Sequence, residues 1–266
     1  MNWSNVPKMG IGQRWNGPQD EVRLKYLGQG INYLEPTLPL PLESIPKGVP
    51  LIAHSSELAI ASTGELNQIM FDCIKNQIIA CTPNWAGEHF TLVSPIETGE
   101  IGYNFSPILD KATLEATIKN VQILSSAYKC PVALECGPRY FPFQDRWDDH
   151  SFLVEISEAT GCGIIFDLSH YIVSMLNLKK NIFEGISEAL LLKIVEIHVT
   201  GIGKHNNGKY HHDCHSSPVP KIGWDLLESI IHHTPLLKGI TLEHDETVLE
   251  EDYRNDISRL NSYKLI

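Results

Sequence analysis

Short apolar runs recur along the chain, and eight of them have the length and composition of β-strands. Most are continuously apolar, which is typical of strands covered on both faces. Amphipathic spacing separates most of them, most clearly where Leu114, Ile118, Val121 and Leu124 fall on one side of a helix. The expected strands are residues 9–13, 31–35, 49–54, 77–82, 131–135, 163–167, 194–199 and 239–243. The expected helices are residues 64–76, 111–128, 148–160, 181–192, 223–233 and 249–263.

Eight strands that alternate with helices predict a (β/α)8 barrel, in one domain over residues 1–266. The alternative is an open, doubly wound sheet, whose ligands would gather at one topological switch point. Polar candidate ligands follow six different strands, which favours the closed barrel. The proline-rich segment 36–47 is expected to form an irregular crossover.

Side chains that bind metals stand where the apolar runs end. The run PLIAH ends in a histidine, VALE and GITLE end in glutamate, and GIIFD ends in aspartate. Because the carboxyl ends of parallel barrel strands open on one face, these side chains are expected to converge there. The six strand-end candidates are His54, His89, Glu135, Asp167, His198 and Glu243.

Two short motifs add further ligands. Asp167 and His170 form DLSH, and a turn or helix after the strand would bring their side chains together. Asp213 and His215 form DCH, and an extended triplet of this kind points both side chains to one face. The alternatives are that Asp167 caps a following helix and that the histidine-rich segment is a polar surface loop.

Nine candidate ligands are too many for a single metal ion. A centre of several ions bridged by a carboxylate, Glu135, is the simplest interpretation. Imidazole and carboxylate ligands suit iron, manganese or zinc better than copper(I) or an iron–sulfur cluster. The alternative for Glu135 is an ion pair with Arg139.

The net charge and the cysteine content restrict the classes of partner and the cellular compartment. The net charge of −11, with histidine neutral, argues against nucleic acid, which requires a basic surface. No segment has the length of a membrane-spanning helix or the pattern of a signal peptide. Six dispersed cysteines without a CxxC pair predict a cytoplasmic protein. The motifs GxSxG, HExxH and the P-loop do not occur.

The ordered motifs resemble those of a known enzyme family. TGCGIIFD, EIH, D-x-H-x-x-PVP and LE occur in this order, together with HSSELAIAS, GEH, ALECGPRY and DLSHYIVSMLN. In this set the chain is similar to the multinuclear non-heme iron-dependent oxidative enzymes, the family of the methanobactin-biosynthesis oxidase. The motifs extend from about residue 9 to about residue 245, which is most of the chain.

The resemblance implies a xylose-isomerase-like barrel that binds two or three irons in mixed Fe(II)/Fe(III) states and uses O2 as co-substrate. It implies oxidative modification of residues, often cysteine, in a ribosomally made peptide, and a partner protein that captures the leader peptide. Glu135, Asp167 and Asp213 are expected to serve the chemistry, and Arg139 and Tyr140 to hold the substrate. By motif, the family's ligands fall on His54, His89, Glu135, Asp167, His198, Asp213, His215 and Glu243, whereas His170 stands where many relatives carry asparagine.

Two other functions fit the same residues less well. A non-redox isomerase or phosphoesterase on the same barrel would use overlapping ligand types. A binding or scaffold protein with a degenerate site would leave buried carboxylates and imidazoles without partners, which is energetically costly.

Overall fold

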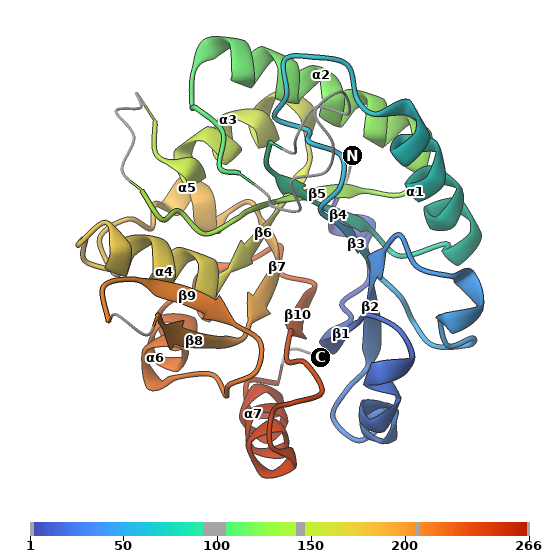
Figure 1. The fold of residues 1–266 in the computed structure, drawn as a ribbon, viewed down its shortest axis with the longest axis vertical. Helices are drawn as coiled ribbons and strands as arrows, with labels where there is room; N and C mark the ends of the chain where they lie inside the picture. The colour runs from blue at the N-terminus through green and yellow to red at the C-terminus, as the bar shows by residue number, and fades with distance from the viewer. Residues whose placement is uncertain (1–2, 93–104, 142–146, 206–207, 265–266) are drawn as a thin grey trace.

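Eight parallel strands form a closed barrel in the computed structural model, which describes residues 3–92, 105–141, 147–205 and 208–264 (Figure 1). The order around the barrel is β1–β10–β7–β6–β5–β4–β3–β2. This arrangement confirms the predicted (β/α)8 fold. The strands are β1 Gly10–Trp15, β2 Tyr33–Leu38, β3 Ala53–Ser55, β4 Ala86–Phe90, β5 Val132–Cys136, β6 Gly163–Asp167, β7 Ile194–Val199 and β10 Gly239–Leu242.

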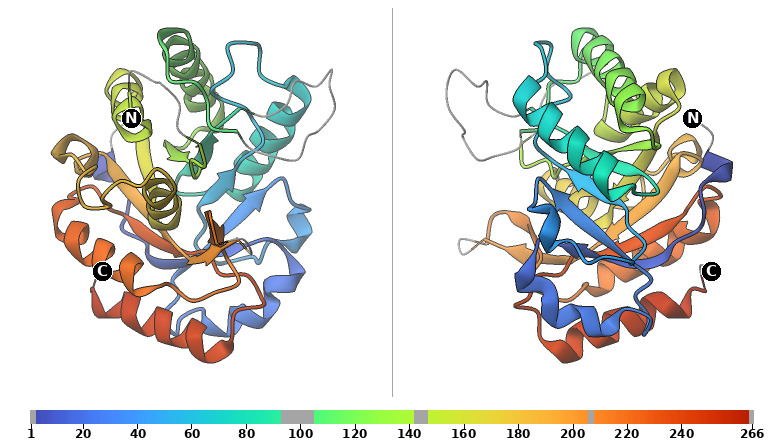
Figure 2. Two further views of the ribbon diagram at one scale, coloured as in Figure 1. Left: turned by 60° about the vertical axis from the view of Figure 1, so that its left-hand side comes forward. Right: turned by 90° about the vertical axis from the view of Figure 1, so that its right-hand side faces the viewer.

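Helices surround the barrel on its outside (Figure 2). Within the described residues, none is long and apolar enough to cross a membrane. A small antiparallel hairpin, β8 Gly201–Lys204 with β9 His211–Cys214, follows β7. The α-helices are α1 Gln68–Cys81, α2 Lys111–Tyr128, α3 Asp149–Thr160, α4 Leu168–Asn177, α5 Glu188–Leu191, α6 Lys221–Ile230 and α7 Glu250–Ser262. The short 3-10 helices are η1 Trp3–Asn5, η2 Pro18–Tyr26, η3 Leu42–Ser44 and η5 Ile231–His233.

The predicted strand at residues 77–82 is wrong. These residues belong to the end of α1, and the fourth strand is β4. Phe71, Ile74 and Ile78 are the buried residues of α1, and their spacing continues one helical face into the apolar run. The helix ends at Thr82, which has the left-handed conformation with φ 48°.

The helices around β6 and β7 also differ from the expectation. The expected helix at 181–192 is reduced to the short α5. The ten-residue α4, which was not among the expected helices, begins directly after Asp167. This helix places His170 one turn beyond the end of β6, where it faces the side chains at the mouth of the barrel.

Aromatic and polar side chains fill the barrel interior on its amino-terminal side. A Cβ at Gly12 would lie 2.1 Å from the Tyr33 ring, so only glycine leaves room for this ring. The Tyr33 hydroxyl lies 2.9 Å from Thr241 Oγ1, whose own hydroxyl donates to Glu196. Trp85 Nε1 also donates to Glu196. This packed and hydrogen-bonded floor leaves the carboxyl ends of the strands as the place for a site.

Candidate metal centre

The register of the barrel brings the strand-end side chains to one level. His89 on β4 is paired with Glu135 on β5, and Asp167 on β6 is paired with His198 on β7. His54 lies next to them on β3, and its ring centroid is 4.9 Å from that of His89. Ligands that are far apart in the sequence therefore meet because neighbouring parallel strands end together.

Glu135 lies at the centre of the group and is almost fully buried. Its Oε2 is 3.0 Å from His54 Nε2 and 3.2 Å from His89 Nε2. Its Oε1 is 3.0 Å from His170 Nδ1. One carboxylate thus faces three imidazoles with both of its oxygens, which is the position of a bridging ligand.

A second part of the group surrounds His198, which is fully buried. His198 Nδ1 is 3.6 Å from both Glu135 Oε2 and Glu243 Oε1. Asp167 faces the same space from β6 and also accepts a hydrogen bond from His170 N at 2.7 Å. Asp167 therefore caps α4, which was the alternative role considered for it. Its other oxygen, Oδ2, still faces the centre.

Asp213 and His215 lie at the edge of this centre. Asp213 Oδ2 is 2.5 Å from His215 Nε2 and 3.7 Å from His170 Nε2. The Ser169 hydroxyl lies 2.6 Å from Asp167 Oδ1 and 2.8 Å from Asp213 Oδ1, and so connects the two carboxylates. The hairpin thereby places both members of the DCH triplet beside the strand-end group.

Four sets of three side chains in the described residues place ligand atoms within 4.8 Å of one another. Every set shares at least one residue with another set. The sets are Glu35, His54 and His198; His54, His89 and Glu135; Glu135, Asp167 and His170; and Asp167, His198 and Glu243. Seven of the nine predicted ligands belong to these sets, and Asp213 and His215 border them. The arrangement has the donor groups for several adjacent ions.

Many polar atoms of this group are buried without a hydrogen-bond partner in the described residues. They include both nitrogens of His54 and His198 and both carboxylate oxygens of Glu135. These atoms approach one another closely but lack the alignment of hydrogen bonds. Because a buried polar atom without a partner costs roughly 1–3 kcal/mol, a cation among them would relieve an unfavourable arrangement. The donor set therefore fits a metal centre.

Burial and the charges of neighbouring side chains strongly shift the pKa values of the groups in the site. Burial disfavours the protonated form of His54, but the carboxylates of Glu135 and Glu35 outweigh this and raise its pKa to about 10. Burial lowers the pKa of His89 to about 4 and raises the pKa of Asp167 to about 7. Although burial acts in the opposite direction, His89 and His198 hold the pKa of Glu135 well below its usual range. The centre thus retains anionic carboxylates that attract a cation.

The two predicted substrate contacts lie on the segment after β5. Arg139 is buried, and its Nε donates to Asp149 Oδ2 at 2.7 Å. The alternative ion pair between Arg139 and Glu135 is therefore wrong, because the guanidinium binds Asp149. Tyr140 is 37% exposed and is available at the surface.

A family model for the RiPP precursor modification enzymes MbnB/TglH/ChrH matches residues 32–263. The chain belongs to this family. Its description is that of enzymes that modify RiPP precursors, the ribosomally synthesised peptides that are altered after translation. The family resemblance drawn from the motifs is confirmed.

Curated relatives of this chain are distant. The UPF0276 protein Anae109_1558 of Anaeromyxobacter sp. (strain Fw109-5) is 23% identical over 70% of this chain and 65% of its own length. The UPF0276 protein VP3015 of Vibrio parahaemolyticus is 25% identical over 74% of this chain and 71% of its own. The alignment thus spans slightly less than two thirds of the Anaeromyxobacter relative.

Solved structures share the barrel of this chain. Mannonate dehydratase from Streptococcus suis serotype2 has a TM-score of 0.61 at 12% identity, covering 96% of this chain and 92% of that one. A xylose isomerase-like TIM barrel protein from Mycobacterium smegmatis in complex with magnesium has 0.56 at 14%, covering 98% and 99%. The IOLI protein with a binding zinc atom has 0.58 at 11%, covering 97% of each chain. At these identities the likeness shows the fold, which is xylose-isomerase-like as expected.

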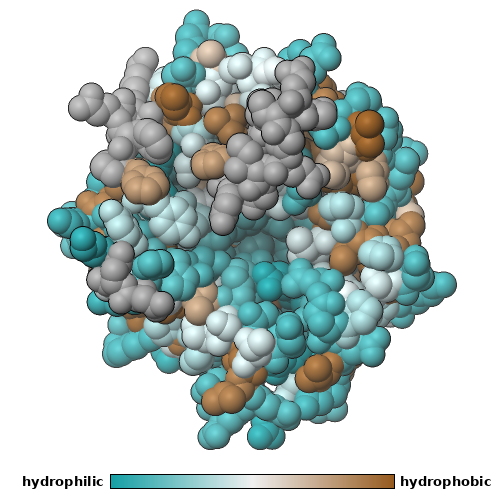
Figure 3. Space-filling model, in the orientation of Figure 1, coloured by the Kyte–Doolittle hydropathy of each residue, from teal (hydrophilic) through white to brown (hydrophobic). Residues whose placement is uncertain are grey.

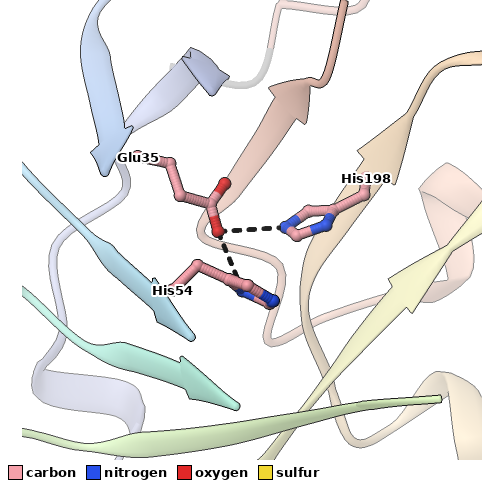
Figure 4. Close-up of side chains that lie close together, drawn as sticks. All are labelled: Glu35, His54 and His198. Carbon is pink, nitrogen blue, oxygen red and sulfur yellow. Dashed lines mark ion pairs between the residues drawn. The ribbon is translucent and has the colours of Figure 1, made fainter. Parts of the chain in front are cut away.

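Glu35 is a buried carboxylate of the group that the sequence pattern did not bring out. It lies on β2 and faces His54 and His198 (Figure 4). Glu35 also ends an expected strand, 31–35, as Glu135 ends the strand 131–135. The rule that ligands stand at strand ends also applies to Glu35. Pro36 follows it directly, at the start of the segment 36–47 that was expected to form an irregular crossover.

Gly87 makes room for the His54 ring, and substituting it is expected to damage the candidate centre. A Cβ there would lie 2.5 Å from His54 Nδ1 and 2.6 Å from Ile165 Cδ1. We expect Gly87→Ala to displace the His54 ring, to weaken metal binding and to cost about 1–3 kcal/mol of unfolding free energy. Urea unfolding and metal titration measure both effects. Gly137→Ala is the control, because its Cβ would meet only Thr91 Cγ2, at 3.9 Å; equal behaviour of the two variants would contradict the account.

Proposed function

We propose that this protein modifies a RiPP precursor peptide and that it does so as an O2-dependent multinuclear iron oxidase, with a cysteine residue of the peptide as the expected target. The observation that supports this most is the sharing of ligands between neighbouring sets around Glu135. Separate mononuclear sites would not share a buried carboxylate between three imidazoles. A centre of two or three ions accounts for this arrangement.

The proposed ligands divide among these ions by position. His54 and His89 would hold one ion, and His198 and Glu243 would hold a second with Asp167. Both would share Glu135, whose Oε2 faces His54 and His89 and also lies 3.6 Å from His198 Nδ1. The residues at the edge would complete the centre, or hold a third ion beside Asp167. These edge residues are His170, Asp213 and His215.

Bound iron would supply open positions for dioxygen and a substrate thiolate, and the redox capacity for the oxidation. The carboxylates of the chain keep the centre anionic. The packed and hydrogen-bonded floor of the barrel lies on its amino-terminal side. The Ser169 hydroxyl joins Asp167 and Asp213 and so holds the two carboxylates together at the edge of the centre, where they would take part in moving the proton that a substrate thiol loses on ionising. We therefore propose Glu135, Asp167 and Asp213 as the residues that serve the chemistry.

The substrate would enter at the open end of the barrel. The molecule is hollowed near the middle of the face seen in Figure 3, and the residues around the hollow are mostly hydrophilic. Exposed aromatic side chains stand beside the segment after β5, where Phe141 and Tyr210 have ring centroids 6.3 Å apart. We propose that Tyr140 contacts the peptide and that Arg139 positions this segment through Asp149. A leader-peptide-binding partner protein is part of the same proposal.

Oxygen consumption tests the proposed chemistry. Protein purified without oxygen and loaded with Fe(II) is expected to consume O2 and to change the mass of a cysteine-containing precursor peptide. The peptide with serine in place of cysteine is the control, and it should stay unmodified. Stoichiometric zinc or manganese that iron cannot replace with gain of O2 reactivity would contradict the oxidase. It would favour a non-redox isomerase or phosphoesterase on the same barrel.

A further inference from the structure

Glu35 lies between His54 and His198, two histidines of the proposed metal centre (Figure 4). Its Oε1 is 3.1 Å from His54 Nδ1 and 3.3 Å from His198 Nε2. The three side chains come from β2, β3 and β7 and are at most 5% exposed. A single carboxylate oxygen therefore faces one nitrogen of each ring.

The other nitrogen of each ring faces the centre. His54 Nε2 is 3.0 Å from Glu135 Oε2, and His198 Nδ1 is 3.6 Å from both Glu135 and Glu243. A neutral imidazole has one N–H and one lone pair. If the lone pairs of both rings face a metal at the centre, both N–H groups lie on the side of Glu35, 3.1 and 3.3 Å from its Oε1.

Glu196 is the only other carboxylate in the described residues with an ion-pair contact to these nitrogens, since its Oε1 is 3.4 Å from His198 Nε2. Its oxygens already accept hydrogen bonds from Trp85 Nε1 and Thr241 Oγ1, each at 2.7 Å. Neither oxygen of Glu35 has a hydrogen-bond partner in the described residues. Glu35 is therefore the acceptor that the two N–H groups lack.

We propose that Glu35 is a positioning residue that accepts an N–H from both His54 and His198 and thereby fixes which nitrogen of each ring binds metal. Carboxylates behind metal-bound histidines orient the ring and increase its basicity. Here one carboxylate orients two ligands on opposite sides of the centre. The inference rests on the proposed metal centre.

The alternative is that Glu35, His54 and His198 hold an ion of their own, since their ligand atoms lie close enough. Both rings would then bind metal through both nitrogens. That requires two imidazolate anions in a site already crowded with Glu35, Glu135 and Glu196. The positioning role needs only neutral imidazoles, so it is the arrangement that the geometry favours.

Nitrogen NMR of the zinc-loaded protein tests the tautomers directly. With Zn(II) as a diamagnetic probe and 15N-labelled histidine, His54 is expected to carry its proton on Nδ1 and His198 on Nε2. A proton on the opposite nitrogen of either ring, or none on both, would overturn the proposal. This measurement uses the unaltered protein and does not depend on how a variant folds.

Glu35→Gln tests the consequence for binding. The amide keeps the shape and one neutral carbonyl oxygen but removes the negative charge that increases the basicity of both rings, so zinc affinity, measured by competition with a chelator, is expected to fall about 10–100-fold. Glu88→Gln is the matched control: Glu88 is equally buried on β4 but contacts Leu58 N and Ser55, not the imidazoles. The zinc affinity of the Glu88→Gln variant should equal that of the wild-type protein.

The outcomes separate this inference from the proposed oxidase. Unchanged zinc affinity in Glu35→Gln would overturn the positioning role while leaving the oxidase intact. Loss of one stoichiometric zinc with the remainder bound at wild-type affinity would also overturn it, because it would identify Glu35 as a ligand. Weakened affinity of all the ions would support the positioning role even if iron gave no reaction with O2.

Discussion

Replacing Glu135 with alanine is expected to remove the metal ions together rather than one at a time. Glu135 contacts His54 and His89 with one oxygen and His170 with the other. Its removal leaves three imidazoles without the shared anion that neutralises bound cations. Because the sets of ligands overlap at this carboxylate, metal content should fall from about two or three ions per chain to below about one. Elemental analysis of protein purified without oxygen measures this directly.

Glu243→Ala is the matched control for the bridging role. Glu243 belongs to one set only, with Asp167 and His198, and is also a buried carboxylate. Its loss should affect one ion and spare the others. If Glu135→Ala and Glu243→Ala each lost a single ion, Glu135 would be an ordinary ligand and the shared centre would be wrong.

Removing the metal is expected to lower the unfolding temperature of the wild-type protein by roughly 8–16 °C. A ligand present at about 1,000 times its dissociation constant stabilises the folded state by about 4.1 kcal/mol. In a domain of this size, each kcal/mol corresponds to about 2–4 °C. The physical source is the set of buried carboxylates and imidazoles that lose their common partner.

Scanning calorimetry with and without a chelator measures this shift. Glu135→Ala provides the control, since a chelator should change its unfolding temperature very little. An identical unfolding temperature for chelated and untreated wild-type protein would show that no ion stabilises the fold. The buried polar atoms would then need another explanation.

The barrel itself could be predicted because continuous apolar runs with polar ends are typical of parallel barrel strands, whose carboxyl ends lie on a common face. Residues 77–82 misled the prediction because an apolar run at the end of an amphipathic helix has the composition of a strand. The true strand β4 contains glycine and two polar residues, and its apolar signal is weak. Only packing against neighbouring strands distinguishes the two segments.

The site was predictable as far as it depends on strand ends. The sequence pattern contains no information on which carboxylate faces which imidazole, because that depends on barrel register. The pairing of Arg139 with Asp149 depends on where α3 begins, ten residues further along the chain. The position of Glu35 behind His54 and His198 likewise requires three strands to be placed side by side.

The metal content of the wild-type protein tests the central claim most directly. Protein grown with iron-57, purified without oxygen and analysed by elemental analysis and Mössbauer spectroscopy is expected to contain two or more irons per chain with the spectrum of a coupled cluster. A single isolated ion, or zinc or manganese that iron cannot replace with gain of O2 reactivity, would contradict a multinuclear iron centre built around Glu135.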